Sequence, residues 1–583
     1  MPDYDIAIVG AGLSGALLAW NLTKQKPGLK VIVLEAGPGT LDVNGNVDRQ
    51  SHIDAFYASP AKFPESPYPP GEAAPSPDVA DLVGDVWKDP SKSYFTYEQK
   101  PTPPAYPFNS TYERLQGGTV WHWLGTTLRF NPNDFKLYST YLKQSGLGSP
   151  ALDWPIGYGD VEPFYEAAEA AIGVAGNVED QTYPQGAPFR GGYQYPMPPI
   201  TPSYLDHVLA GALDGYVIPD FDAPAKLTVR STPQGRNSMN YNGRPPCMGN
   251  TNCVPICPIG AKYDPMVHVL AAMRQGVVFQ NRSVVFNILL GDDHKTIAGI
   301  QYMTYDGTVQ PTITAKLYVL AAHAVETPRL LLLSNLANSS GQVGRNLMDH
   351  NTQLSWALMP EGKNVYGYRG PLSTCGIEDL RDGPFRATRG AFRIELGNDG
   401  WNWPTGAPAT DVLALVGQGK FGAALREAMH DRGTRQFRVA SLVEPIGVPT
   451  NYVKLSESYR DPLGLPRPEL NYKLQEYETN GLIAARRAAV ALFRQLGATD
   501  FTTKAAAEPE GFFGAGHILG TARMGSDPKT SVTDSYGRTW DHPNLFIAGA
   551  PLFPSVSCVN PSLTIAALTL RSAKYIAENW GAG

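Results

Sequence analysis

The fold of this chain is decided by the stretch Tyr4-Asp-Ile-Ala-Ile-Val-Gly-Ala-Gly-Leu-Ser-Gly-Ala16. Its apolar run from Ile6 to Val9 is typical of a buried parallel strand. Glycines follow at the spacing G-x-G-x-x-G, then a helical interval, and then a second apolar run, Val31-Ile-Val-Leu34, which ends at Glu35. A strand, a glycine loop, a helix and a strand in this order predict a βαβ unit that binds a dinucleotide.

Each glycine of the loop has its own part in this prediction. Gly10 permits the tight turn, Gly12 lets backbone amides approach a pyrophosphate, and Gly15 lets the helix pack close to the strand. Glu35 is placed to accept hydrogen bonds from a ribose 2′-hydroxyl, and it would repel the 2′-phosphate of NADP. The alternative is a glycine-rich turn without a ligand, which the flanking strand, helix and acid disfavour. The motif alone does not distinguish FAD from NAD.

Composition bounds the class of protein. The 583 residues allow two or three domains and a large core. A hydrophobic content of 43% with 17% charged residues fits a globular enzyme rather than a disordered chain. The net charge of −6 disfavours a nucleic-acid binder, and five cysteines are too few for a disulfide scaffold. The sequence shows no apolar run that could span a bilayer and no signal-peptide pattern, so we expect a soluble chain.

The composition and the hydrophobic periodicity change several times along the middle of the chain. Residues 38–110 are rich in Pro, Ser, Tyr and Asp, which predicts a long irregular excursion: a lid or partner surface, or else a solvated insertion. Thr327-Pro328 predicts the start of a helix, with the proline in its first turn. Alternation at 438–443 and 452–455 predicts an antiparallel sheet, and 484–496 predicts an amphipathic helix. Because the C-terminal end is again glycine-rich, we expect a discontinuous nucleotide-binding domain with a sheet-based domain inserted into it.

Several motifs, in one order along the whole chain, carry a resemblance to a known family. The stretch Gly516-His-Ile-Leu-Gly-Thr-Ala-Arg-Met-Gly525 decides it, supported by residues 10–35, 117–118, 343–350, 544–550 and 560–568. With these motifs the chain resembles the glucose–methanol–choline (GMC) oxidoreductases. The resemblance implies that the dinucleotide is FAD. It also implies the GMC fold of the α/β class, a Rossmann-like FAD-binding domain with an inserted antiparallel-sheet substrate domain.

Within the family, the chain looks like the FAD/iron–sulfur large subunits of bacterial sugar dehydrogenase complexes that act on glucose, fructose or gluconate. The shared marks are Trp121-His-Trp123, Asn131-Pro-Asn-Asp-Phe-Lys136 and Cys247-x5-Cys253-x3-Cys257-Pro258. On this resemblance we expect the FAD-binding domain in 1–157, 238–348 and 508–583, with the cysteine segment 247–257. We expect the substrate-binding domain in 158–237 and 349–507.

His517 is the leading catalytic candidate. Oxidising an alcohol by hydride transfer requires a base for the hydroxyl proton, and imidazole has a suitable pKa. Asn560 resembles the second member of the family's active-site pair, where a neutral amide holds the hydroxyl without competing for its proton. The alternatives are a structural His beside glycine-rich backbone and a turn Asn before Pro561. The resemblance favours catalytic roles for both residues.

The resemblance also implies which residues hold the flavin. His122, in Gly117-Gly-Thr-Val-Trp-His122, is similar to a His that carries the flavin covalently through its 8α carbon in some relatives. The alternative is a non-covalent His packed by two Trp rings. The expected cofactor-binding residues are Gly10, Gly12, Gly15, Glu35, Gly117, Gly118, His122, Gly549, Ala550 and Pro561.

The cysteine segment predicts a second redox group. Cys247, Cys253 and Cys257 are followed by Pro258, and thiolates with a Pro after the last one are typical of iron–sulfur sites. A structural zinc would need a fourth Cys or His, which this segment lacks. The family resemblance implies a 3Fe-4S cluster on three cysteines. The alternative is three unrelated free thiols.

Together these features predict an FAD-dependent dehydrogenase that oxidises a sugar, glycoside or polyol hydroxyl to a carbonyl. The resemblance implies electron transfer through the 3Fe-4S cluster to a membrane cytochrome c subunit. It also implies a small chaperone-like subunit for export, and a place at the periplasmic face of the inner membrane. One alternative is a GMC-type sugar oxidase, similar to pyranose oxidase, that reduces oxygen to hydrogen peroxide. Another is a non-catalytic FAD-binding partner, which an intact His517 and Asn560 disfavour.

Overall fold

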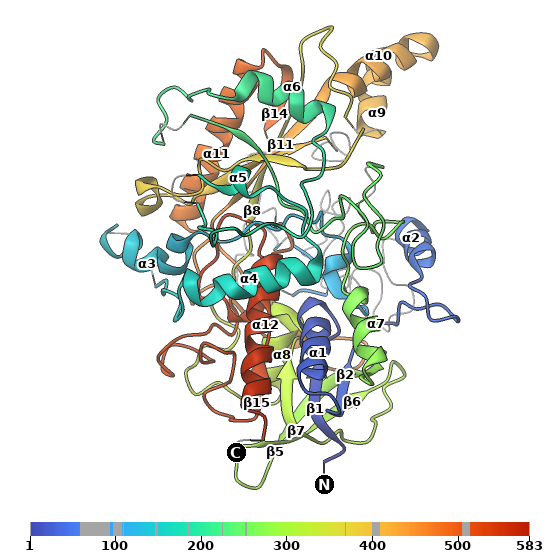
Figure 1. The fold of residues 1–583 in the computed structure, drawn as a ribbon, viewed down its shortest axis with the longest axis vertical. Coiled ribbons are helices and arrows are strands. Elements are labelled where there is room, and N and C mark those ends of the chain that lie inside the picture. The colour runs from blue at the N-terminus through green and yellow to red at the C-terminus, as the bar shows by residue number, and fades with distance from the viewer. Residues whose placement is uncertain are drawn as a thin grey trace.

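The computed structural model describes residues 2–58, 94–96, 108, 110–145, 150–183, 186–223, 226–250, 253–367, 369–398, 409–503 and 514–581. Figure 1 shows two regions stacked along the long axis of the molecule. The lower region holds both chain termini and a parallel sheet, and the upper region holds an antiparallel sheet.

The parallel sheet has five strands in the order β15-β7-β1-β2-β4. It draws on three distant parts of the chain, since its strands are β1 (Tyr4–Val9), β2 (Val31–Leu34), β4 (Val278–Gln280), β7 (Ala315–Leu320) and β15 (Leu545–Ile547). Strand β2 and the last four residues of β1, Ile6–Val9, are buried. Burial on both faces explains why Ile6–Val9 and Val31–Leu34 are unbroken apolar runs rather than alternations.

Helices from both ends of the chain pack beside this sheet (Figure 1). Helix α1 (Leu13–Gln25), which follows the glycine loop, contacts α12 (Ser562–Glu578) and α7 (Met266–Arg274). Helix α12 in turn contacts α4 (Tyr158–Ile172). The first and last segments of the chain therefore lie together at the glycine loop.

Helix α8 (His323–Leu333) begins earlier than the sequence predicts. The expected start at Thr327, with Pro328 in the first turn, is wrong, because His323 adopts a left-handed backbone (φ 67) that lets the chain enter the helix there. Pro328 consequently lies inside the helix, where it cannot donate to the carbonyl of Ala324. The Thr521 hydroxyl donates to that carbonyl instead, at 2.6 Å.

The antiparallel sheet has six strands in the order β14-β8-β11-β10-β9-β3. They are β3 (Val229–Ser231), β8 (Asn351–Leu358), β9 (Cys375–Ile377), β10 (Phe392–Gly397), β11 (Gln436–Val443) and β14 (Thr499–Thr503). Helix α11 (Glu476–Gln495) packs against β8 and β11. The parallel and antiparallel sheets confirm the predicted mixed architecture, and β11 and α11 confirm the strand at 438–443 and the helix at 484–496.

Shorter elements complete the fold. Two hairpins pair β5 (Val284–Leu290) with β6 (Ile297–Met303) and β12 (Tyr452–Arg460) with β13 (Pro466–Asn471), the second of which confirms a strand at 452–455. The remaining helices are α2 (Arg49–Ala58), α3 (Leu137–Thr140), α5 (Val178–Gln181), α6 (Tyr204–Leu213), α9 (Ala409–Gly417) and α10 (Gly422–Arg435). Short 3₁₀ turns span Gly118–Trp121, Pro132–Lys136, Leu142–Gln144, Pro384–Ala387 and Ala550–Leu552.

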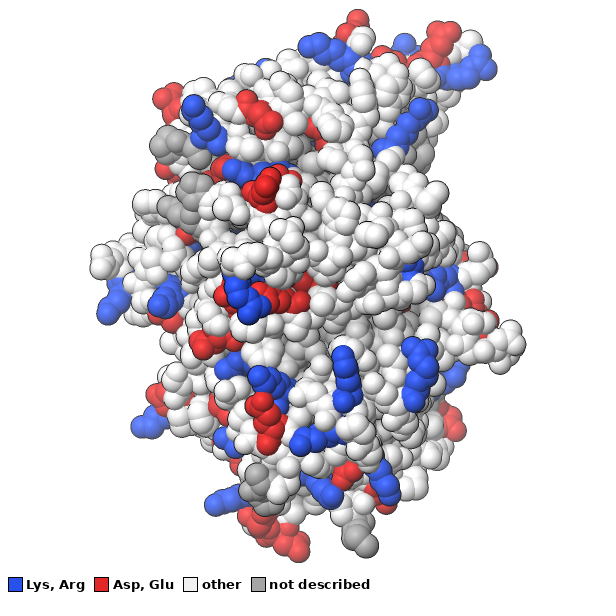
Figure 2. All heavy atoms as spheres, in the orientation of Figure 1, with Lys and Arg blue, Asp and Glu red and all other residues white. Residues whose placement is uncertain are grey.

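The excursion expected at 38–110 lies largely outside the described residues, apart from 38–58, 94–96, Phe108 and Ser110. Its first part forms α2 and is therefore not wholly irregular. On the face drawn in Figure 2, basic and acidic side chains are interspersed rather than gathered into a field of one sign. Among the described helices, none has the length and apolar character needed to cross a membrane.

Candidate active site

His517 lies in the loop before β15, directly after Gly516, whose backbone is left-handed (φ 72). Its Nδ1 lies 3.0 Å from Nδ1 of His350, the residue just before β8. The two rings are perpendicular, with their centroids 5.0 Å apart. A side chain of the C-terminal segment thus meets one at the entry to the antiparallel sheet.

The partners of His350 determine which nitrogens of the pair carry protons. His350 Nε2 lies 2.5 Å from the carbonyl of Ser557, and a carbonyl can only accept, so this nitrogen carries a hydrogen. The Nδ1 of a neutral His350 then holds a lone pair and accepts from His517 Nδ1–H. His517 is left with its lone pair on Nε2, the nitrogen that can act as a base.

Both rings are neutral near pH 7. Burial lowers the pKa of His350 to about 4. Burial, and next the adjacent His350 ring, hold the pKa of His517 well below its usual range. A neutral His517 therefore has a lone pair that can accept a proton at neutral pH.

Asp349 holds the backbone of His517 in place. One carboxyl oxygen accepts from the His517 backbone N–H at 2.9 Å, and the other accepts a short hydrogen bond from the Ser110 hydroxyl. Burial raises the pKa of Asp349 to about 7, against the lowering effect of the bonds from Ser110 and His517. Although Asp349, His350 and His517 present donor atoms within 4.8 Å of one another, the hydrogen bonds above engage those atoms. The arrangement is that of a proton-positioning network rather than a metal site.

Asn560 lies on the base side of His517. Its amide nitrogen is 3.4 Å from His517 Nε2. Its amide oxygen is buried without a hydrogen-bond partner among the described residues. The structure thus brings the two predicted catalytic residues together, with an amide and an imidazole lone pair side by side where a hydroxyl could bind.

The glycine loop has the shape that a dinucleotide requires. Gly10 has φ 100, and a Cβ there would lie 2.5 Å from the carbonyl oxygen of Ala321. A Cβ on Gly15 would lie 1.9 Å from the carbonyl of Gly10. A Cβ on Gly118 would lie 3.0 Å from Gly12 Cα, so the Gly117-Gly118 segment passes close to the loop. These bare backbones at the start of α1 fit a pyrophosphate.

Glu35 and Gly549 lie close to the same helix start. Glu35 is buried, and its two carboxyl oxygens accept from the backbone N–H groups of Ala11 and Gly37, each at 2.8 Å. Burial raises the pKa of Glu35. A Cβ on Gly549 would lie 2.6 Å from Ser14 Oγ in α1, which places the Gly549–Ala550 turn beside the loop. Pro561 is the residue before α12.

His122 follows the 3₁₀ turn Gly118–Trp121. Its Nε2 lies 2.8 Å from a carboxyl oxygen of Glu113. This is a close charge contact rather than a hydrogen bond of good geometry. A carboxyl group facing Nε2 favours the tautomer with its hydrogen on Nε2 and its lone pair on Nδ1. The side chain of Trp121 is fully buried, whereas Trp123 is partly exposed.

The three cysteines lie among buried cations. Cys253 and Cys257 are buried and Cys247 is partly buried. Arg236 Nη1 lies 3.5 Å from Cys253 Sγ, and burial raises the pKa of Cys247. Buried thiols next to a guanidinium fit an iron–sulfur cluster, whose net negative charge the cation offsets.

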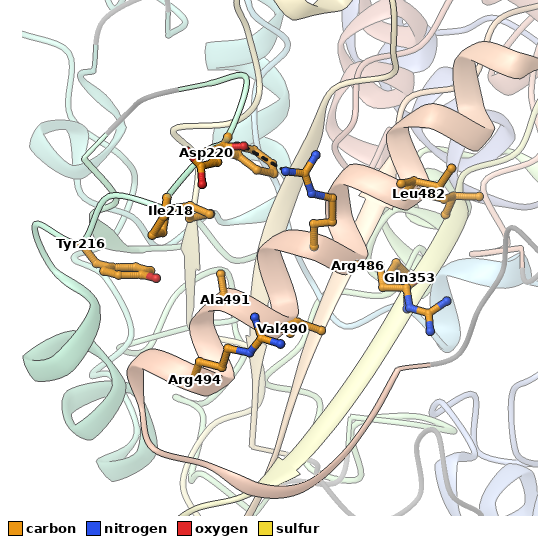
Figure 3. Close-up of a pocket in the computed structure, with 13 residues that line it drawn as sticks. Tyr216, Ile218, Asp220, Gln353, Leu482, Arg486, Val490, Ala491 and Arg494 are labelled. Carbon is orange, nitrogen blue, oxygen red and sulfur yellow. Dashed lines mark hydrogen bonds between the residues drawn. The ribbon is translucent and has the colours of Figure 1, made fainter.

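A groove of the described surface lies away from these residues. It has a volume of about 590 Å³ and runs between α11 and residues 216–221. In Figure 3 Arg486 and Arg494 extend from α11 along it, and Arg487 donates to the carbonyl of Asp220 at 2.9 Å. None of the residues predicted from the sequence to form a catalytic, cofactor or metal site lines this groove.

Sequence reasoning missed His350, Asp349 and Ser110 as site residues. Asp349 and His350 end the motif Val343–His350, which was quoted only for the family resemblance. A signal was available, since two adjacent titratable residues directly before a predicted sheet region are candidates for a site. Ser110 stands in the irregular 38–110 region, and nothing in its local sequence marks it.

Comparison with known proteins identifies relatives along the whole chain. Family models described as GMC oxidoreductase match residues 222–352 and 448–569, and one described as lycopene cyclase protein matches residues 5–54. The fructose dehydrogenase large subunit of Gluconobacter japonicus is 33% identical over 98% of this chain and 97% of its own length. The gluconate 2-dehydrogenase flavoprotein of Pantoea cypripedii is 26% identical over 100% and 94%. A formate oxidase structure from Aspergillus oryzae has a TM-score of 0.61 at 15% identity, covering 99% and 98% of the two chains.

Proposed function

The chain belongs to the GMC oxidoreductase family, and we propose that it is a sugar or polyol dehydrogenase rather than an oxidase. Membership makes it an FAD-dependent oxidoreductase of CH–OH groups with the GMC fold. The proposed FAD-binding domain comprises 1–157, 238–348 and 508–583, and the proposed substrate domain comprises 158–237 and 349–507. Bound FAD supplies the two-electron acceptor for the substrate carbon.

The observation that carries the catalytic part of the proposal is the His517–His350 hydrogen bond. It leaves the Nε2 lone pair of His517 next to the Asn560 amide, so a substrate hydroxyl can donate to Nε2 and accept from the amide nitrogen. His517 takes the hydroxyl proton while the carbon loses its hydride. His350 accepts from the imidazolium that this step creates, and Asp349 keeps the His517 backbone in place.

For the cofactor, we propose that the glycine loop with Gly117, Gly118, Gly549, Ala550 and Pro561 holds FAD. We further propose that His122 forms a covalent bond to the flavin through Nδ1. The Glu113 contact supports this assignment, because a carboxyl oxygen 2.8 Å from Nε2 favours the tautomer with its lone pair on Nδ1.

For electron transfer, we propose that Cys247, Cys253 and Cys257 hold a 3Fe-4S cluster, which supplies a one-electron carrier between the flavin and an acceptor. The fructose dehydrogenase relative is named a large subunit, and this supports a place in a complex. The proposed partners are a membrane cytochrome c subunit and a small chaperone-like subunit that exports the chain to the periplasmic face of the inner membrane. The cysteine segment also argues against the oxidase alternative, since direct transfer to oxygen needs no such carrier.

An anaerobic titration tests the proposed function. The protein is purified without air and mixed with a panel of glucose, fructose, gluconate, polyols and glycosides, while the flavin band is followed. Bleaching by one of these substrates, with iron and sulfide present, is the expected result. In a second assay, run in air with that substrate, dye reduction should exceed peroxide formation. No bleaching by any of them would refute the substrate class, and rapid peroxide formation would favour the oxidase.

A further inference from the structure

Lys262 is a buried cation with an unusual set of partners. Its side chain is 1% exposed, and its ammonium group donates to three backbone carbonyls. These belong to Trp121 at 2.8 Å, Trp123 at 2.5 Å and Cys253 at 2.6 Å. An ammonium group has three hydrogens, so all of its donors are used.

The three carbonyls lie in two segments with different proposed tasks. Trp121 and Trp123 flank His122, whereas Cys253 is a proposed cluster ligand. One side chain therefore joins the backbone on both sides of the flavin attachment point to the backbone of a cluster residue. A neutral hydrogen bond already joins neighbouring parts of the same two segments, because Trp123 Nε1 donates to the Tyr263 carbonyl at 2.7 Å.

A cation is a costly way to join backbone segments. Burying an ammonium group is unfavourable unless nearby negative charge or strong dipoles compensate. Arg236, which is 1% exposed and contacts Cys253 Sγ, is a second buried cation at the same place. Two cations beside three cysteines are explained if the cysteines carry a negatively charged cluster.

We propose that Lys262 is a positioning residue for electron transfer. It holds the backbone around His122 against the Cys253 backbone, and so keeps the distance and orientation between flavin and cluster constant. This inference rests on the proposed function, namely on a flavin at His122 and a cluster at the cysteines. Each transfer oxidises the flavin by one electron and reduces one ferric ion of the cluster to ferrous. The substrate supplies two electrons, and two equivalents of a one-electron acceptor such as ferricyanide remove them.

The test compares Lys262→Met with Trp123→Phe, which removes the neighbouring indole tie but leaves the Cys253 carbonyl bond intact. Full-length proteins are purified anaerobically and assayed for iron and for the electron paramagnetic resonance signal of the oxidised cluster. Flash photoreduction with deazaflavin and EDTA then delivers electrons to the bound flavin. Absorbance follows their passage to the cluster, so no substrate is needed.

We expect Lys262→Met to keep flavin and iron but to slow electron transfer from flavin to cluster by about tenfold or more. Rate losses of this size are typical when the geometry of a preorganised site is loosened. Trp123→Phe should transfer at the wild-type rate. If Lys262→Met does not fold, Lys262→Gln, which keeps two donors, should fold and show the slowing. A wild-type rate in the Lys262 variant that folds, or equal slowing in Trp123→Phe, would overturn the inference. Absence of iron from the wild-type protein would instead overturn the proposed function, and this inference with it.

Discussion

Replacing His350 by Leu tests the central feature of the site, the hydrogen bond between two imidazole rings. Leu can neither accept from His517 Nδ1 nor donate to the Ser557 carbonyl, which the native ring contacts at 3.0 and 2.5 Å. When His517 takes the substrate proton, its ring becomes a cation and the bond to His350 becomes charge-assisted. Hydrogen bonds to charged groups contribute about 1.5–3 kcal/mol, against about 0.5–1.5 kcal/mol for neutral pairs.

The difference between these two ranges, about 1–1.5 kcal/mol, is stabilisation that exists only once the proton has moved. Its loss alone slows the reaction by about 5–10-fold, since about 1.4 kcal/mol corresponds to a factor of ten. Losing the bond also frees the His517 ring to place its hydrogen on Nε2, which makes the base unavailable in part of the molecules. We expect a total decrease in the flavin-reduction rate of about 10–100-fold, smaller than the ~10²–10⁴-fold cost of removing a general base.

The assay is anaerobic stopped-flow bleaching of the flavin by the best substrate of the sugar panel. His268→Leu is the matched control, because His268 is another buried ring. It contacts the Tyr263 hydroxyl at 2.8 Å and is not part of the His350–His517 pair. Both variants should lose thermal stability, but only His350→Leu should bleach slowly. Wild-type bleaching in His350→Leu would refute the reasoning. A loss as deep as that of His517→Ala would also contradict it, because it would mean that His350 is itself the base.

Four further predictions concern the candidate base, the flavin attachment, the cysteine segment and Asp349. His517→Ala should lower turnover by ~10²–10⁴-fold while flavin stays bound, and wild-type-like turnover would remove the assignment of the base. Acid-denatured, washed wild-type protein should stay yellow and His122→Ala should lose its flavin; a colourless wild-type pellet would disprove the covalent bond. Cys253→Ser should spare flavin reduction by substrate but slow reduction of a cytochrome, and full cytochrome reduction by this variant would rule out the relay. The pKa of Asp349 is raised to about 7, so its proton stabilises the folded state at low pH, and this contribution is lost as the pH rises through about 7. The melting temperature of Asp349→Asn should therefore fall less between about pH 5 and pH 8 than that of the wild-type protein, and identical pH profiles would contradict the shift.

The parts of this protein that were predictable from sequence are those with local signals. The glycine loop places its strand, turn, helix and acid within about thirty residues, and each element has a known physical cause. The motif around His517 likewise predicted the candidate base, and the structure places the Asn560 amide 3.4 Å from its Nε2. Helix α8 shows the limit of such signals. Pro328 is normally a first-turn residue, but a left-handed His323 and the Thr521 hydroxyl together allow it inside the helix.

The pairing of His350 with His517 had no local signal. His350 and His517 are separated by 167 positions in the sequence, and only the packing of the C-terminal loop on the entry to β8 brings their rings to 3.0 Å. The three bonds of Lys262 have the same character, because their acceptors are backbone carbonyls, which any residue carries. Contacts of this kind depend on tertiary structure alone.

The choice of partner for His517 has a chemical consequence. A carboxyl oxygen of Asp349 lies within 4.8 Å of a ring nitrogen of His517. The carboxyl oxygens nevertheless accept from the His517 backbone and from Ser110, and the ring meets a neutral imidazole instead. A carboxylate on the ring would raise the pKa of His517 and keep it protonated near neutral pH, when it could no longer accept the substrate proton. His350, whose own pKa is lowered to about 4, fixes the orientation and the tautomer without adding charge. The same neutrality makes protonated His517 costly inside the site, so the proton taken from the alcohol must leave before the next turnover.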